Sequence, residues 1–537
     1  MLGPLPSRIR YAMLRFNAAR DAKTPATTMS ETSRTRTADV SAAHSATAPP
    51  MTTSIGHAAA RSIIIGIMLA MFLSALEQTI VAPALPTIGR SLADIENLSW
   101  VVTVYLLSAT VATPLFGKLS DIYGRRLMML ISLGVFIAGS VACALAPTMG
   151  TLILARALQG FGGGGILPLG HTVIADLLSP RERPLIQSWS SAMFLAASIL
   201  GPVLGGVLTD YVHWSLIFWI NLPLGVVAVL MTDRALRRLP RNERPHRLDF
   251  MGAALMVVAA IALLLALGWG GTRYRWTSPE IVGLLGASAV LWALFTLRLV
   301  KAPEPFIPLT MMREPVVFGI VIAAFFSIGT IVGLSIFVPL YMELLLGHSA
   351  SASGAALIAF MCGATVGSLL AGRLMSRIEH YKRVPVAALP IGIAAVAVFA
   401  VWPGGLSLLE VVALLALAGA GVGPMYPATT VIIQNAVPPH QFGVATGTLA
   451  FFRQLGGAII VAVFGAIVLG GIGADPGGLS VDKLAGAGGA GEHLIAAFRW
   501  VFVAAAAFLG LAFIAVLAVE ERPLHGPRTH AASAAAE

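Results

Sequence analysis

A short polar segment, GKLSDIYGRR, separates two apolar runs of this chain, and each run is long enough to cross a lipid bilayer. The segment extends only from Gly117 to Arg126, which leaves room for a tight connection between two helices and little else. Hydrophobic residues make up 57% of the 537 residues and charged residues 11%, whereas about 25% of the residues in ordinary globular domains are charged. The mean hydropathy is +0.85. The pattern therefore predicts an all-α membrane protein.

The distribution of apolar runs predicts fourteen membrane spans, arranged as six, two and six. A crossing needs about 20 apolar residues. The predicted spans are 62–82, 99–116, 127–146, 151–174, 187–208, 216–231, 250–268, 281–299, 316–342, 354–374, 384–402, 406–429, 442–469 and 494–519. The predicted domains are a disordered cytoplasmic tail (1–60), a six-helix half (61–233), a basic loop with two inserted helices (234–315), a second six-helix half (316–519) and a short cytoplasmic tail (520–537).

The placement of Lys and Arg explains the formal net charge of +10 as a topological signal. These residues concentrate in the N-terminal segment and in one set of alternate loops, between Lys118 and Arg383. The other set of loops holds only Arg90, Arg273, Arg275 and Lys483. Because cytoplasmic loops are enriched in Lys and Arg, we expect both termini to face the cytoplasm. The charge does not indicate nucleic-acid binding.

A repeated loop segment indicates that the chain has two related halves. The segment AGRLMSRIEHYKR, from Ala371 to Arg383, follows the second span of the last six just as GKLSDIYGRR follows the second span of the first six. Repeats related by an axis along the membrane normal build transporters whose halves move about a central site. The second copy has Ser376 where the first has Asp121, so the two copies are not equivalent at this acid.

Five segments together resemble the major facilitator superfamily, and in particular its fourteen-helix drug:proton antiporter branch. They are LEQTIVAPALPTIG (76–89), GKLSDIYGRR (117–126), LARALQGFGGG (154–164), ASILGPVLGG (197–206) and WSLIFWINLPLG (214–225). The resemblance implies the major facilitator fold with two pseudo-symmetric six-helix halves. The chain departs from the branch at Glu77, Ala197 and Ser215, where Asp, Gly and Arg are usual. These departures leave the ionisable centre in place and bear on the substrate and the proton stoichiometry.

Glu77 and Arg156 are the predicted proton-coupling residues. At roughly 1.5 Å per residue, Glu77 lies about 22 Å across a hydrocarbon core of about 30 Å. Arg156 lies near the start of a span that runs in the opposite direction, so the two side chains reach a similar depth. An ionised carboxylate is costly there, which suits a group that exchanges a proton during transport. The alternative interpretation is a permanent structural ion pair.

The fifth span carries the motif that the resemblance identifies as the antiporter motif, made of Ala197, Gly201, Pro202, Gly205 and Gly206. Ala197, Gly201 and Gly205 recur every four residues, which places small side chains on one face for close helix contact. The resemblance implies a tight seam that prevents leak during exchange. Plain helix packing is a compatible alternative.

In the loop motif, Gly117 and Gly124 permit close contact and a tight turn, and Asp121 can face the positively polarised N-terminus of a helix. Arg125 and Arg126 hold the loop in the cytoplasm. The resemblance implies a latch that stabilises one access state. The alternative is an anchor that only fixes topology.

Seven residues are predicted to line or neighbour a substrate cavity, in which aromatic rings would receive a flat hydrophobic cation. They are Trp100, Tyr105, Gln159, Phe194, Phe337, Tyr341 and Arg453. For the aromatic residues, ordinary core packing is the alternative. His171 is interpreted as a polar contact, and Glu343 and Glu410 lie near helix ends as candidates for cation attraction only. Gly160, Gly162 and Gly165 match a dinucleotide-binding pattern, but no strand precedes them, so they are assigned to packing.

The sequence predicts a secondary active exporter, and not an enzyme, in the plasma (inner) membrane. Protons would enter while an amphipathic, drug-like compound leaves, by alternating access of the two halves. We expect a small molecule and protons as partners, a monomeric transport unit and no cofactor or metal, because the proton gradient supplies the energy. The alternatives are an exporter of a specific metabolite, siderophore or natural antibiotic, and a non-transporting membrane sensor on the same scaffold.

Overall fold

The computed structural model describes residues 57–237, 249–271, 273–302, 304–472 and 490–524. By contacts between Cα atoms the chain divides into two units, Met1–Pro50 and Met51–Glu537, and the first unit lies outside the described residues. The remainder of the predicted N-terminal tail up to residue 56, the basic residues Arg241, Arg244 and Arg247, Lys483, and residues 525–537 also lie outside the described residues.

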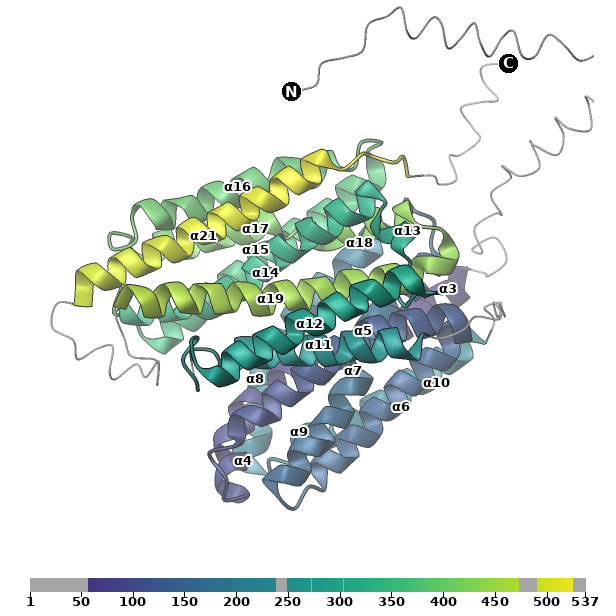
Figure 1. The fold of residues 1–537 in the computed structure, drawn as a ribbon, viewed down its shortest axis with the longest axis horizontal. Coiled ribbons are helices and arrows are strands. Elements are labelled where there is room, and N and C mark those ends of the chain that lie inside the picture. Colours follow the sequence, from purple (N-terminus) through teal and green to yellow (C-terminus); the bar gives the residue numbers. More distant parts are fainter. Residues whose placement is uncertain (1–56, 238–248, 272, 303, 473–489, 525–537) are drawn as a thin grey trace, which may run out of the picture. The chain divides into compact units, whose positions relative to one another are not determined.

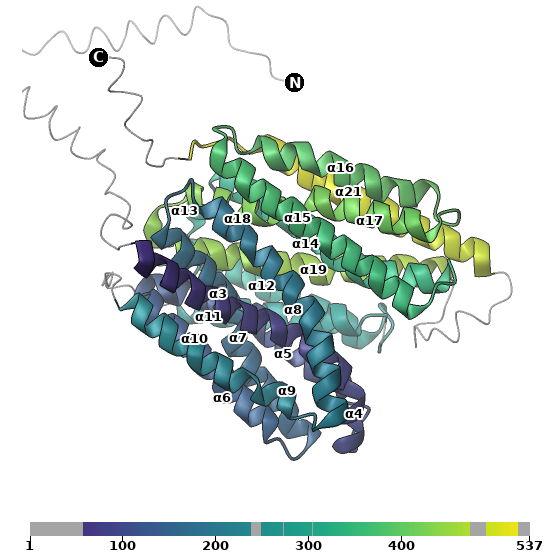
Figure 2. The same ribbon diagram turned by 180° about the vertical axis from the view of Figure 1, so that it is seen from behind.

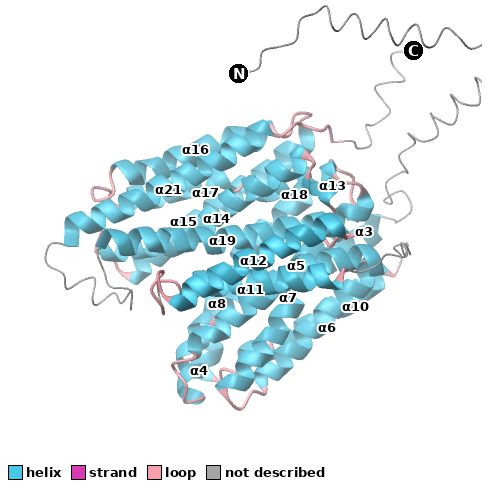
Figure 3. Ribbon diagram, viewed as in Figure 1, coloured by secondary structure: helices cyan, strands magenta, loops and turns pink. Residues whose placement is uncertain are grey.

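Every regular element of the described residues is a helix, as Figure 3 shows. Fourteen helices among these residues are long and apolar enough to cross a membrane, and each corresponds to one predicted span. The prediction of an all-α membrane protein with fourteen spans is therefore confirmed. In lipid, a single apolar run can pair its backbone N–H and C=O groups within itself only as a helix, because the alternative, a closed barrel, needs several strands.

The first six spans pack into one bundle, the N-terminal half. Its helices are α3 (His57–Ile80), η2 (Ala82–Ala84), α4 (Leu85–Ser91), α5 (Leu98–Tyr123), α6 (Arg125–Ala144), α7 (Met149–Leu177), α8 (Arg183–Tyr211), α9 (Leu216–Trp219) and α10 (Asn221–Leu236). The first span is not one straight helix, because Pro83 and Pro86 cannot donate backbone hydrogen bonds and divide it into α3, η2 and α4.

The last six spans pack into the C-terminal half, seen at the top of Figure 1. Its helices are α13 (Leu309–Met312), α14 (Pro315–Leu344), α15 (Ala350–Arg377), α16 (Arg383–Val401), α17 (Leu408–Val422), α18 (Met425–Ala436), η3 (Pro439–Gln441), α19 (Phe442–Ile472) and α21 (Ala490–Ala518). The twelfth span is interrupted between α17 and α18, where Pro424 follows Gly423.

The two inserted helices are α11 (Phe250–Trp269) and α12 (Pro279–Lys301), which pack against each other. α11 packs against α5 and α19, one helix from each half, and the inserted pair lies at the front in Figure 1 and at the back in Figure 2. Side chains of α5, α11 and α19 share a small core that contains Val111, Ala260 and Phe451. The insertion therefore covers the line along which the two halves meet.

The loop motif is more helical than the sequence suggested. α5 continues to Tyr123 and α6 begins at Arg125, so within this segment Gly124 alone is not helical. Its φ of 90° lies in a region that L residues other than glycine rarely adopt, which allows the chain to reverse in a single residue. We call the end of the bundle that holds this turn the loop-motif end.

Several helix pairs join the halves. α5 packs against α19, α8 packs against α15 and α18, and α7 also contacts α19. Glycines permit the first of these contacts, because a Cβ at Gly117 would overlap the carbonyl oxygen of Gly443, and a Cβ at Gly443 would overlap that of Gly117. The backbones of α5 and α19 therefore touch near the loop-motif end.

Candidate functional site

Glu77 lies at the centre of a buried polar cluster in the N-terminal half. Its side chain, on α3, has 0% exposure. One carboxylate oxygen forms an ion pair with Arg156 of α7, and the other accepts a hydrogen bond from the side-chain amide of Asn221 at the start of α10. The structure thus brings together the two residues predicted for proton coupling, although they are 79 positions apart in the sequence.

Arg156 is held on every side by groups from three helices. Its Nε donates to the carbonyl oxygen of Val101 at 3.0 Å, and its Nη1 donates to Oε1 of Gln159 at 2.7 Å. The guanidinium carbon lies 4.2 Å from the centre of the Tyr105 ring. These contacts fix the charge beside Glu77 and stabilise it by cation–π interaction.

The cluster includes three side chains that the sequence did not identify. Ser140 of α6 accepts hydrogen bonds from Gln159 at 2.8 Å and from Asn221 at 3.3 Å, and the Cys143 thiol lies 3.5 Å from Gln159. Asn221 carried a detectable signal, because it is a lone amide inside the apolar run WSLIFWINLPLG. Ser140 carried none, since serine is common in membrane helices and can bond to its own backbone.

Glycines of α7 allow the cluster to form. A Cβ at Gly160 would overlap the backbone of Tyr105, one at Gly162 would overlap the backbone of Phe136, and one at Gly164 would overlap the backbone of Ala109. α7 can therefore lie directly on α5 and α6, which carries Arg156 and Gln159 to the partners just described. The assignment of Gly160, Gly162 and Gly165 to packing agrees with the structure, since a Cβ at Gly165 would overlap the side chains of Phe116 and Ser132.

The antiporter motif forms the contact between α8 and α3 immediately beside Glu77. Ala197 is fully buried, and its carbonyl oxygen accepts a hydrogen bond from Thr79 at 2.8 Å. A Cβ at Gly201 would overlap Thr79, and one at Gly205 would overlap the carbonyl oxygen of Ile80. The remaining two members of the motif, Pro202 and Gly206, do not take part, because Pro202 is exposed and a Cβ at Gly206 would meet no atom within 4 Å.

The loop motif joins the two halves through Asp121. Its Oδ1 accepts a hydrogen bond from the backbone N–H of Gly443 at 3.0 Å, and its Oδ2 accepts one from Val444 at 2.7 Å. Both donors belong to the first turn of α19, so the carboxylate sits at the positive end of that helix. Arg125 pairs with Asp121 and with Asp176 of α7.

The second copy of the loop motif makes no such connection. Ser376, which stands in the place of Asp121, donates only to the carbonyl oxygen of Arg373 in its own helix turn. Arg126 of the first copy pairs with Asp233 at 2.6 Å, within the N-terminal half. Among the described residues, the charged connection between halves is thus one-sided.

A second polar contact between halves surrounds His171. Nδ1 of His171, on α7, shares a hydrogen bond with Oε1 of Gln187 on α8. The Gln187 amide donates to Gln434 of α18 at 3.3 Å, and Gln434 donates back to the His171 carbonyl oxygen at 3.2 Å. All three side chains are buried. We call Asp121 with Gly443 and Val444, together with His171, Gln187 and Gln434, the cross-half lock.

The structure does not gather the predicted cavity residues into one site. Tyr341 donates a hydrogen bond to the Pro403 carbonyl oxygen at 2.6 Å, and Phe337 stacks edge-on against Phe464, both in the core of the C-terminal half. Trp100 packs against Trp269 of the insertion. Helix packing buries Tyr341 and Phe337, and Trp100 is half-buried, so the expectation of a shared cage for a flat cation is not supported.

The other predicted residues are divided between the two halves. Tyr105 and Gln159 belong to the Glu77 cluster, whereas Phe194, on α8, is 39% exposed. Arg453 is buried on α19. Glu410 caps α17 with Ser407, and Glu343 lies in the last turn of α14. Cap formation explains Glu410, so it carries no functional assignment.

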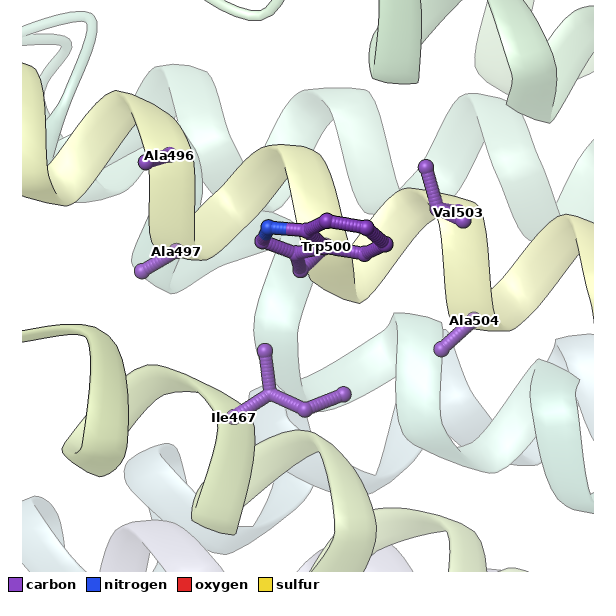
Figure 4. A pocket seen from close by; sticks show the side chains of 6 residues that line it. All are labelled: Ile467, Ala496, Ala497, Trp500, Val503 and Ala504. Carbon is purple, nitrogen blue, oxygen red and sulfur yellow. The ribbon is translucent and has the colours of Figure 1, made fainter.

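An apolar groove of about 540 Å³ lies between α19 and α21. Figure 4 shows its lining residues, which are Ile467, Ala496, Ala497, Trp500, Val503 and Ala504. It holds none of the predicted site residues. Among the described residues, no group of three or more His, Cys, Asp or Glu side chains is arranged to hold a metal ion.

Fourteen spans, two joined six-helix bundles and a buried acid–base cluster define a multi-pass membrane protein of the secondary-transporter class. The chain belongs to the major facilitator superfamily, whose family model matches residues 67–461. It is 34% identical over 433 residues to the multidrug transporter protein MdtP of Bacillus subtilis, covering 79% of this chain and 77% of that protein. The multidrug resistance protein 3 of the same organism is 32% identical over 416 residues, covering 78% and 81%.

Solved structures agree with the fold. The human organic anion transporter MFSD10 (TETRAN) superposes with a TM-score of 0.60 at 17% identity, over 85% of this chain and 99% of that one. A bacterial homologue of the iron transporter ferroportin in an outward-facing state superposes with a TM-score of 0.61 at 12% identity, over 86% and 100%. The protein is a transporter of small molecules and not an enzyme.

Proposed function

We propose that this protein exports amphipathic, drug-like compounds across the plasma membrane in exchange for protons, as a monomer that needs no cofactor. The curated relatives named multidrug transporters support the substrate class. The observation that carries proton exchange is Glu77, a carboxylate with 0% exposure near the middle of the first span. A buried ionisable group in a membrane span is a functional-site hypothesis by default.

The Glu77 cluster has partners suited to both protonation states. In this structure Glu77 only accepts hydrogen bonds, from Arg156 and Asn221, while Oδ1 of Asn221 is buried without a partner. A protonated Glu77 gains an O–H donor, and rotation of the Asn221 amide would turn Oδ1 toward that donor. Arg156 would keep Gln159 and the Val101 carbonyl oxygen as acceptors.

We also propose that the loop-motif end faces the cytoplasm. The positive-inside distribution of Lys and Arg supports this orientation. The cross-half lock would then close the cytoplasmic side, and its rupture would accompany the switch to the opposite access state. The seam of Ala197, Gly201 and Gly205 contacts Thr79 and Ile80, which closely follow Glu77 on α3, so movement of α8 against α3 would be transmitted to its carboxylate.

Efflux in membrane vesicles with an imposed pH gradient tests the proposal. We expect the wild-type protein to move a fluorescent amphipathic drug only when the gradient is present, and Glu77→Gln to lose this dependence. Glu96→Gln is the matched control, because Glu96 is an exposed acid in the loop before α5. Transport that ignores the gradient in the wild-type protein, or gradient-driven transport retained by Glu77→Gln, would contradict proton coupling through this residue.

A further inference from the structure

Arg453, on α19, is a buried cation whose hydrogen bonds all use one nitrogen. Its Nη2 donates to the Tyr426 carbonyl oxygen at 3.0 Å and to the Thr429 and Thr430 hydroxyl oxygens at 2.6 and 2.8 Å. The guanidinium carbon lies 4.5 Å from the centre of the Tyr426 ring. Arg453 is only 7% exposed, and its buried Nε has no hydrogen-bond partner.

The oxygens around Arg453 are neutral. Thr429 and Thr430 use their hydroxyl protons on the carbonyl oxygens of Met425 and Tyr426, so they only accept from the guanidinium. No carboxylate of the described residues lies within 4.0 Å of Arg453, whereas Arg156 has one such partner and Arg125 has two. A buried charge without a counter-charge strongly destabilises a protein unless something else compensates it.

Arg453 lies at the depth where transporters of this architecture hold their substrates. It lies near the middle of the span Pro439–Gly470, and such sites lie near the bilayer midplane between the repeats. The next residue, Gln454, contacts Thr110 of α5 in the other half at 2.6 Å.

The same residue lies directly inside the closed end of the transporter. Thr446 contacts Gln434 of the cross-half lock at 3.3 Å, and Arg453 follows two helical turns later, about 10 Å farther from the loop-motif end. A compound that entered from the opposite end would therefore meet Arg453 before it met the lock.

We propose that Arg453 is the binding site for an anionic group of the transported compound, a carboxylate, sulfonate or phosphate, which supplies the missing counter-charge. This inference rests on the proposed export function and defines its substrate class: an amphipathic acid rather than a flat cation. Nε offers a free donor in a buried site, where a charge-assisted hydrogen bond is strong. The uncharged hydroxyl oxygens of Thr429 and Thr430 hold the guanidinium in place without balancing its positive charge.

Equilibrium binding of two matched fluorophores to the purified full-length protein tests the inference. Dansylglycine carries one carboxylate, and dansylglycinamide is its neutral counterpart. We expect the wild-type protein to bind dansylglycine about 10- to 100-fold more tightly than the amide, the range for a charge-assisted contact. Arg453→Gln should abolish this preference while leaving the amide affinity unchanged, and Arg453→Lys should retain part of it.

Arg90→Gln is the matched control, since Arg90 is an exposed arginine that bonds only within its own helix. Equal affinity of the wild-type protein for the two fluorophores, including no binding of either, would overturn the inference. If Arg453→Gln weakened the binding of dansylglycine and of dansylglycinamide by the same factor, this would also overturn the inference, because it would show that Arg453 has a structural role. The measurement uses no pH gradient, so its outcome is separate from that of the vesicle assay, and gradient-independent transport would leave the anion preference intact.

Discussion

Asp121→Asn should open the cross-half lock without disturbing the rest of the loop motif. The carboxylate accepts one backbone N–H of α19 on each oxygen, from Gly443 at 3.0 Å and from Val444 at 2.7 Å. An asparagine keeps one acceptor oxygen and turns its NH2 group toward the second N–H, where two donors oppose each other. Arg125 would keep its ion pair with Asp176, so the N-terminal half should remain folded.

The size of the effect follows from these contacts. Losing one hydrogen bond to a charged group costs about 1.5–3 kcal/mol, and removing the negative charge from the N-terminus of α19 costs up to about 2 kcal/mol in a partly buried site. Because both contacts join the two halves, the loss falls on the locked state alone. A combined loss of about 2–4 kcal/mol corresponds to roughly a 30- to 700-fold shift in the equilibrium away from that state.

Distances between spin labels at the loop-motif end would measure this shift. Tyr123 at the end of α5 and Pro438 before α19 are exposed, and cysteines placed there can carry the labels once Cys143 and Cys362 are replaced. We expect Asp121→Asn to convert a single short distance into a distribution dominated by a longer one.

Asp233→Asn provides the control for this measurement. Asp233 is an acid at the same end of the bundle, and it pairs with Arg126 and Arg237 inside one half. Its replacement should therefore leave the distance unchanged. If Asp121→Asn keeps the wild-type distribution, or if Asp233→Asn moves it equally, the contact between Asp121 and α19 does not hold the two halves together.

Three further predictions concern stability, measured as the unfolding free energy or midpoint in detergent. Arg156→Gln should destabilise the protein by about 3–5 kcal/mol, because it leaves the buried Glu77 carboxylate without a counter-charge, and adding Glu77→Gln should recover part of that loss; a further loss in the double variant would refute the pairing. Gly205→Ala should cost about 1–3 kcal/mol through overlap with α3, whereas Gly206→Ala should cost almost nothing, and equal losses would contradict the seam. Tyr341→Phe should cost about 1–3 kcal/mol by leaving a buried carbonyl unpaired, and an unchanged midpoint would count against that hydrogen bond.

The sequence predicted the architecture well because lipid imposes it. Each apolar run must become a helix to satisfy its backbone, so run lengths alone located all fourteen spans. The pairing of Glu77 with Arg156 was also within reach, since depth along two antiparallel spans can be counted from helix rise. Whether the aromatic residues form a cage could not be predicted, because an aromatic residue such as Tyr341 or Trp100 gives the same sequence pattern whether it faces a cavity or a neighbouring helix.

What the sequence by itself determined is where the chain crosses the bilayer and which charges lie inside it, because the cost of an unpaired backbone group or a buried charge is fixed by the solvent. Only the tertiary structure decided which of those charges have partners. Glu77 and Arg156 neutralise each other across two helices, whereas Arg453 meets only neutral oxygens among the described residues. Compensation depends on contacts a few ångströms long between helices far apart in the chain, and these follow from packing at glycines such as Gly160 and Gly201.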